Sequence, residues 1–148
     1  MSRSHSTRPT IYIAEDNPIL LQGLDRALSA SGYQVATASS GEAVLELLDQ
    51  AENLPDLLLL DVMMPGISGF DVLRMLQAHP GSRGLPVVMI TAATDEALRE
   101  EARREGAADF LIKPFRRGEL LERIEAHVSR TRAGAEARPI AKQVRGAV

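Results

Sequence analysis

A lysine directly before a proline, Lys113, is one of only two lysines among the 17 basic residues of this chain. The other fifteen are arginines, so a lysine here indicates a need for a compact ammonium charge instead of a planar guanidinium. Candidate partners are an acidic pair, Glu15 and Asp16, together with Asp61 and Thr91. Each of these features, like the lysine, follows a short apolar run. The chemistry of the chain is therefore expected at the ends of these runs.

The residue types suggest which chemistry this is. Three carboxylates crowded together repel one another and need a cation at neutral pH. The chain has no cysteine and its three histidines are scattered, so hard oxygen ligands point to Mg²⁺. Mg²⁺ typically shares its coordination sphere with phosphate oxygens, which Lys113 and Thr91 could also contact. The pattern predicts a Mg²⁺-assisted phosphoryl pocket in which a carboxylate could be the nucleophile and form an acyl phosphate.

Alternating strands and helices must position these groups. Strands are expected at 10–14, 34–38, 57–60, 86–90 and 109–112, and helices at about 18–31, 41–52, 68–78, 95–106 and 117–130. Asn17 and Ser40 are the expected N-caps of the first two helices. The alternation predicts a single α/β domain with one doubly wound, five-stranded parallel sheet and helices on both faces. In such sheets, ligands bind beyond the carboxyl ends of the strands.

Apolar patterning indicates which side chains enter the core. The continuous run Leu57–Leu60 is typical of a central parallel strand that is covered on both faces. On the first helix, one expected apolar face comprises Ile19, Leu20, Leu24, Ala27 and Leu28.

Composition and charge limit the function classes. The chain is 45% hydrophobic and 25% charged, as in globular proteins. No apolar run approaches the roughly 20 residues that cross a bilayer, and residues 1–9 lack the apolar core of a signal peptide. We therefore expect a cytoplasmic protein without a membrane contact.

The charges are unevenly distributed. Residues 10–128 carry 10 basic and 19 acidic side chains, whereas the flanks carry seven basic residues and one acidic residue. An acidic body with basic ends is not typical of a nucleic-acid binder. The expected organisation is a disordered N-terminus at 1–9, one domain at 10–131, and a basic disordered tail or linker at 132–148.

Four stretches together closely resemble the receiver domain of bacterial two-component response regulators, over about residues 10–128. They are Ile-Tyr-Ile-Ala-Glu15-Asp16-Asn, Leu-Leu-Leu-Leu-Asp61-Val-Met-Met-Pro-Gly-Ile-Ser-Gly69, Val-Val-Met-Ile-Thr91-Ala-Ala and Gly-Ala-Ala-Asp-Phe110-Leu-Ile-Lys113-Pro114-Phe. This resemblance implies a flavodoxin-like sheet with strand order 2-1-3-4-5.

The resemblance also implies roles for single residues. Asp61 would accept a phosphoryl group from a histidine kinase or a histidine phosphotransfer protein. Asp16 would bind Mg²⁺ directly and Glu15 largely through water, with the backbone carbonyl of Met63 as a further ligand. Lys113 would pair with the phosphoryl oxygens or, in their absence, with Asp61.

The same resemblance identifies the groups that would respond to phosphorylation. Thr91 and the Ala92 amide would hydrogen-bond the phosphoryl group, and Phe110 would be the switch aromatic, although it is also simply a core residue. The Lys113–Pro114 bond would be cis. Thr91 could instead be a helix N-cap, a role that Thr94 could also fill.

Phosphorylation would shift the fourth helix, fifth strand and fifth helix and so control a protein partner, with a homodimer through residues 95–128 as one form of output. Beyond its own phosphorylation and dephosphorylation, the chain would not be an enzyme. Two alternatives remain open: a receiver portion of a longer regulator or hybrid kinase, and a phosphatase with an Asp nucleophile. Such phosphatases typically carry a second Asp two positions after the nucleophile, where this chain has Met63.

Overall fold

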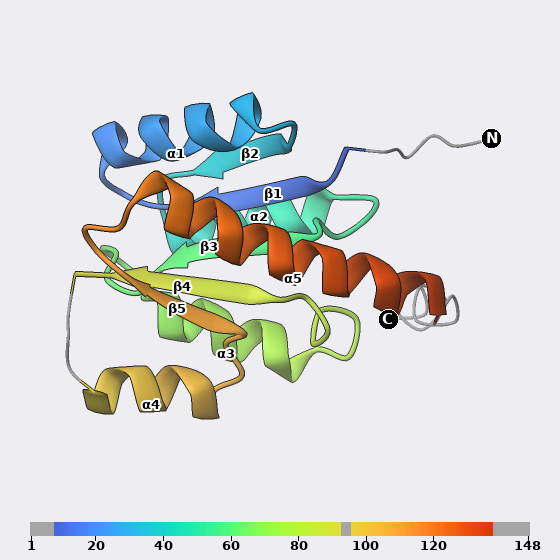
Figure 1. The fold of residues 1–148 in the computed structure, drawn as a ribbon. Helices are drawn as coiled ribbons and strands as arrows, with labels where there is room; N and C mark the ends of the chain where they lie inside the picture. Colours follow the sequence, from blue (N-terminus) through green and yellow to red (C-terminus); the bar gives the residue numbers. More distant parts are fainter. Residues whose placement is uncertain (1–7, 93–95, 138–148) are drawn as a thin grey trace.

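The five strands form one parallel sheet in the order β2-β1-β3-β4-β5 (Figure 1), which confirms the predicted doubly wound fold. The computed structural model describes residues 8–92 and 96–137, with side chains up to residue 133. The strands are β1 (Thr10–Ala14), β2 (Gln34–Ala38), β3 (Leu57–Asp61), β4 (Val87–Thr91) and β5 (Asp109–Ile112). The helices are α1 (Pro18–Ala30), α2 (Gly41–Gln50), α3 (Gly69–Ala78), α4 (Glu96–Arg104) and α5 (Arg117–Ala137).

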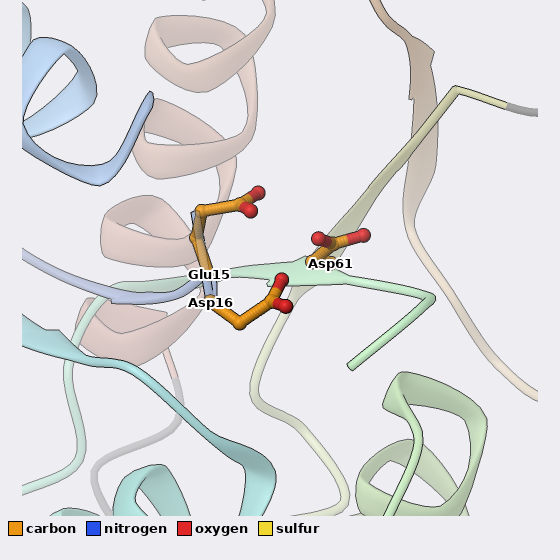
Figure 2. Close-up of side chains that lie close together, drawn as sticks. All are labelled: Glu15, Asp16 and Asp61. Carbon is orange, nitrogen blue, oxygen red and sulfur yellow. The ribbon is translucent and has the colours of Figure 1, made fainter. Parts of the chain in front are cut away.

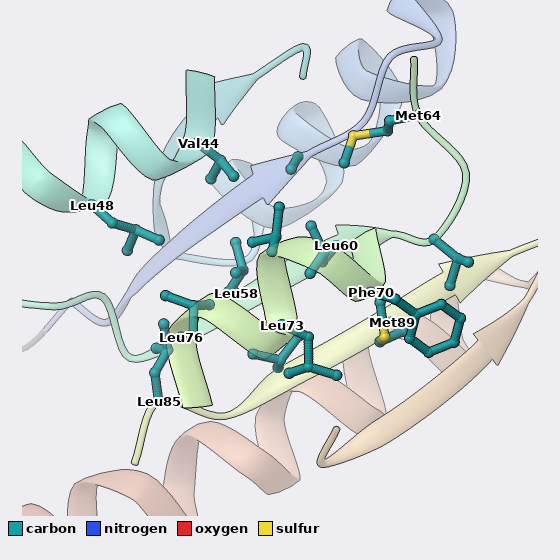
Figure 3. Close-up of a cluster of buried hydrophobic side chains, with 14 of the residues drawn as sticks. Val44, Leu48, Leu58, Leu60, Met64, Phe70, Leu73, Leu76, Leu85 and Met89 are labelled. Atoms are coloured by element: carbon teal, nitrogen blue, oxygen red, sulfur yellow. The ribbon is translucent and has the colours of Figure 1, made fainter. Parts of the chain in front are cut away.

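The sheet separates two hydrophobic clusters, because successive side chains of a strand point to opposite faces. In β3, Leu57 and Leu59 pack with α1 and α5 on one face, while Leu58 and Leu60 pack with α2 and α3 on the other. Figure 3 shows the second cluster, in which Phe70 and Leu73 of α3 lie over the sheet. Every residue of β3 is buried, as expected for a central strand covered on both sides.

Local side-chain hydrogen bonds begin the helices where the sequence predicts. The Asn17 side chain accepts hydrogen bonds from the amides of Ile19 and Leu20, and the Ser40 hydroxyl accepts one from Ala43. These contacts confirm both predicted N-caps. The start predicted for α4, Asp95, and the alternative cap Thr94 lie outside the described residues.

The prediction that Ile19 belongs to the buried apolar face of α1 is wrong. Ile19 is 81% exposed, whereas Leu24 and Leu28 are buried. Ile19 precedes Leu24 by five residues, which at 3.6 residues per turn turns it about 140° away from the sheet-facing side. The apolar face of α1 that packs on the sheet is therefore narrower than predicted, and Ile19 lies on the surface at the start of α1.

Helix α5 continues to Ala137, beyond the end near Arg130 that the sequence pattern predicts. At the start of the added part, Arg132 Nε lies 3.2 Å from Oδ1 of Asp56, which directly precedes β3. The helix therefore includes residues 131–137, of which 132–137 were expected to belong to a disordered tail. Among the described helices, none combines the length and apolar character needed to span a bilayer.

Candidate functional site

The predicted polar residues converge at one edge of the sheet. Glu15 and Asp16 directly follow β1, Asp61 ends β3, Thr91 ends β4 and Lys113 directly follows β5. Because β3 pairs with both β1 and β4, Asp61 lies in the centre of this group. The residues that line the resulting open pocket are Glu15, Asp16, Asn17, Asp61, Met63, Thr91, Ala92 and Lys113.

Three carboxylates meet in this pocket (Figure 2). One oxygen each of Glu15, Asp16 and Asp61 lie within 4.8 Å of one another. Glu15 is fully buried and Asp61 is 3% exposed, whereas Asp16 is exposed to solvent. The group therefore has two carboxylates on its floor and one at its open side.

Lys113 pairs with two of these carboxylates. Its Nζ lies 3.1 Å from Glu15 Oε1 and 3.3 Å from Asp61 Oδ2. The resemblance implied the contact with Asp61 alone, so the contact with Glu15 is an addition. It follows from the tertiary structure, which brings the residues after β1 and after β5 into the same pocket. The peptide bond between Lys113 and Pro114 is cis.

Burial and neighbouring charges shift the pKa values of both Glu15 and Lys113. Burial raises the pKa of Glu15, and the charge of Asp61 raises it further. The hydrogen bond from the backbone amide of Asn17 and the positive charge of Lys113 lower this pKa but do not outweigh the increase. Burial alone would lower the pKa of Lys113, but its contacts with Glu15 and Asp61 outweigh this and raise it. The pKa of Lys113 is thus raised by its two carboxylate partners, whereas burial is the main cause of the raised pKa of Glu15.

The donor set fits a divalent cation. Three carboxylates and one ammonium leave a formal charge of −2 in the pocket, and all the available ligand atoms are hard oxygens, which Mg²⁺ prefers. Glu15 Oε1 is buried, and its ion pair with the Lys113 ammonium at 3.1 Å is not aligned as a hydrogen bond. The residues that would hold the ion are Glu15, Asp16 and Asp61, with the Met63 carbonyl as the proposed fourth ligand.

Met63 and Phe110 differ in their relation to the pocket. The Met63 amide donates to Asp61 Oδ1 at 3.1 Å, while the Met63 side chain is 68% exposed. Phe110 is partly buried and packs against the cluster formed with α2 and α3. Phe110 is not among the described residues that line the pocket. Any part that it plays in switching must therefore act through β5.

Asn17 is a pocket residue that the sequence alone identified only as a helix cap. Its backbone amide donates to Glu15 Oε2 at 3.0 Å, and its side chain caps α1. One residue thus fixes the Glu15 carboxylate and the start of α1 together. Its position directly after the acidic pair was the available signal.

Mg²⁺ should stabilise the folded protein. At a Mg²⁺ concentration ten times the dissociation constant, the expected gain is about 1.4 kcal/mol, measured as a rise in Tm. Because the folded-state pKa of Glu15 is raised, the folded protein binds this proton more tightly than the unfolded chain. Without a cation, this group therefore makes stability fall as pH rises from about 4.5 through the folded-state pKa. The stabilisation by Mg²⁺, measured as the rise in Tm, should therefore be larger at pH 7.5 than at pH 5.

Asp16→Asn provides the control for this measurement, since it removes a solvent-facing ligand without disturbing the buried pair. The Mg²⁺-dependent rise in Tm should shrink at least by half in this variant. An equal rise in both proteins, or an equal rise with NaCl at the same ionic strength, would contradict the assigned metal site.

Comparison with known proteins gives a consistent result. The model of the family described as "Response regulator receiver domain" matches residues 11–125. The chain is 39% identical over 125 residues to the phosphate regulon transcriptional regulatory protein PhoB of Rhizobium meliloti, covering 84% of this chain and 54% of that protein. It is 39% identical over 126 residues to the transcriptional regulatory protein KdpE of Mycobacterium tuberculosis, covering 85% of this chain and 54% of the relative. The chain thus spans about half the length of these curated relatives.

A solved structure agrees with these matches. The response regulator receiver domain protein from Clostridium thermocellum superposes with a TM-score of 0.78 at 28% sequence identity. The superposition covers 84% of this chain and 98% of that chain.

Proposed function

This chain belongs to the response regulator receiver domain family, whose general function is two-component phosphorelay signalling, and we propose that Asp61 is its phosphoacceptor. One observation carries the proposal most directly: Asp61 is buried at the centre of the pocket, 3.3 Å from Lys113 Nζ and among carboxylates that suit a divalent cation. The donor would be a phosphohistidine on a histidine kinase or a histidine phosphotransfer protein.

The proposed reaction is an in-line phosphoryl transfer. A carboxylate oxygen of Asp61 forms a bond to phosphorus while the P–N bond to the donor imidazole breaks, and its electron pair returns to the ring nitrogen. Lys113 neutralises charge on the phosphoryl oxygens, and the Thr91 hydroxyl and Ala92 amide donate hydrogen bonds to them. Mg²⁺ bound by the carboxylates would supply further charge neutralisation.

Intact-protein mass spectrometry tests this proposal. Incubation with Mg²⁺ and acetyl phosphate should give one phosphoryl adduct, in which a P–O bond breaks and acetate leaves. Omission of Mg²⁺ or addition of EDTA should prevent it. Absence of the adduct, together with absence of Mg²⁺-dependent beryllofluoride binding, would reject the proposed phosphoacceptor pocket.

Exposed apolar side chains beside the pocket are the proposed contact for the donor protein. Met63 lines the pocket, and Ile19 lies on the first turn of α1, next to the pocket residue Asn17. Both side chains are mostly in solvent, where large apolar groups gain free energy if a partner covers them. A donor that carries its phosphohistidine on a protein surface must approach this side of the pocket.

Ile19→Asp should therefore slow phosphotransfer from a protein donor by about tenfold or more, since about 1.4 kcal/mol of contact energy corresponds to a factor of ten. Phosphorylation by acetyl phosphate should be unchanged, because the small donor needs no surface contact. The two rates can be compared by phosphoprotein gel or mass spectrometry. Equal slowing with both donors would show that Ile19 supports the pocket itself and not the donor.

The proposed output surface is formed by α4, β5 and α5. Helix α4 has only Ala102 buried among its described residues. Arg74 of α3 lies 3.3 Å from Glu101 of α4 and 3.2 Å from Glu105, which directly follows α4. A helix with so little buried surface can move at low cost. Phosphorylation would shift an existing equilibrium of these elements.

A homodimer through 95–128 is one form this output could take, because α4 exposes charges of both signs, which suits a self-complementary two-fold contact. Analytical ultracentrifugation with and without Mg²⁺ and beryllofluoride should show stronger self-association in the activated state. Arg99→Glu should reduce it. Identical association in both states would contradict the switching proposal for a dimer, and would leave a different protein target.

The matched relatives are named as transcriptional regulators and are about twice as long as the matched region. For this chain we propose control of a protein partner or of a domain attached elsewhere, and no direct contact of residues 10–131 with nucleic acid. The phosphatase alternative has no support in the site, because Met63 occupies the position at which those enzymes carry their second Asp, and its side chain points largely into solvent.

A further inference from the structure

The loop between β3 and α3 carries the backbone carbonyl of Met63, the proposed fourth Mg²⁺ ligand. Its base is well fixed: the Gly69 amide donates to the Val62 carbonyl at 2.8 Å, and Ser68 forms a capping box with Asp71. The Met63 amide is held by Asp61. These contacts leave the outer part of the loop, Gly66 and Ile67, to be held from elsewhere.

The first turn of α2 holds that outer part. The Ile67 amide donates to Glu42 Oε2 at 3.3 Å, and the carboxylate lies directly against Gly66. A Cβ added to Gly66 would meet Glu42 Oε2 at 2.6 Å, and the Gly66 φ of +81° is one that favours glycine. Gly41 is equally close, since a Cβ there would meet Ile67 Cγ1 at 2.6 Å. The Glu42 carboxylate therefore lies in close contact with Gly66, and the Ile67 side chain lies in close contact with the start of α2.

We propose that Glu42 is a positioning residue for Mg²⁺ binding, which acts through Gly66 and Ile67 to hold the loop that presents the Met63 carbonyl. The inference rests on the proposed function, since it concerns the same Mg²⁺ site. Glu42 itself does not line the pocket among the described residues, so it does not touch the ion. Groups that orient metal ligands typically change metal affinity when they are removed.

Two features make a glutamate suitable here. Its carboxylate is an acceptor only, which matches the Ile67 amide that turns toward it. It also lies in the first turn of α2, where the positive end of the helix dipole favours a negative side chain. Because Glu42 is exposed, its contribution to overall stability should be small, and its effect should be confined to the geometry of the loop.

The test compares Mg²⁺ dissociation constants of variants of the 148-residue chain by isothermal titration calorimetry. Glu42→Ala removes the acceptor and should weaken Mg²⁺ binding by about fivefold, less than the 10–100-fold found for partners of direct side-chain ligands. Glu42→Gln loses the charge but keeps an amide oxygen that can accept from Ile67, and should stay within about twofold of the wild type. Glu46→Ala is the matched control, because Glu46 is an exposed acid one turn further along α2.

Several outcomes would overturn the proposal. An unchanged dissociation constant for Glu42→Ala would show that the loop is held without this residue. Equal weakening by Glu46→Ala or by Glu42→Gln would show that net charge, and not the hydrogen bond to Ile67, controls affinity. The acetyl phosphate reaction separates this inference from the proposed function: if the wild type binds Mg²⁺ and forms the adduct while Glu42→Ala behaves identically, only the role of Glu42 fails.

Discussion

Replacing Asp61 with asparagine should abolish the phosphoryl adduct that we expect in the wild type with Mg²⁺ and acetyl phosphate. An amide oxygen is a poor nucleophile compared with a carboxylate, and loss of the nucleophile in covalent catalysis reduces rates by at least about a thousandfold. Asn also keeps nearly the same shape and leaves Lys113 paired with Glu15. The loss should therefore be chemical and not structural.

Two measurements accompany this variant. Its Tm in the absence of Mg²⁺ should equal or exceed that of the wild type, because one of three mutually repelling carboxylates is neutralised. Asp49→Asn, on the exposed surface of α2, makes the same chemical change away from the pocket and should retain the adduct. An adduct that persists in Asp61→Asn, located by peptide mapping to another residue, would disprove the assignment of the phosphoacceptor.

Gly69→Ala should be strongly destabilising. A Cβ at this position would overlap the Asp61 carbonyl oxygen and would lie 2.9 Å from Val62 Cα. Both are backbone atoms of the segment that carries the phosphoacceptor, so no flexible side chain can move to relieve the overlap. Overpacking typically costs about 1–3 kcal/mol and occasionally more; here we expect about 3 kcal/mol or more, measured by urea denaturation, together with slower phosphorylation as Asp61 is displaced.

Gly23→Ala is the matched control for this substitution. Gly23 lies within α1, and a Cβ there would meet nothing within 4 Å, so the higher helix propensity of alanine should stabilise the protein by up to about 1 kcal/mol. Both variants replace a glycine with an alanine, but their expected effects on the free energy of unfolding have opposite signs. A Gly69→Ala protein with an unchanged denaturation midpoint and an unchanged phosphorylation rate would show that the β3–α3 connection is looser than its contacts indicate.

The order of strands and helices could be predicted from the sequence because each is encoded locally. Short strand-forming runs, the caps at Asn17 and Ser40, and the alternation of the two element types are all local patterns. They also place Asp61, Thr91 and Lys113 at strand ends. Because the carboxyl ends of parallel strands share one edge of a sheet, residues far apart in the chain were correctly expected to meet there.

The sequence by itself thus determined the fold class and the edge of the sheet at which the polar residues gather. The tertiary structure alone decided the contact of Lys113 with Glu15 and the approach of Glu42 to the loop after Asp61. It also brought Arg132 of the extended α5 into contact with Asp56, two residues separated by 76 positions. The physical reason is the same in each case: these features depend on distances between elements that pack together only after the sheet has formed, and no local pattern of residue types records such distances.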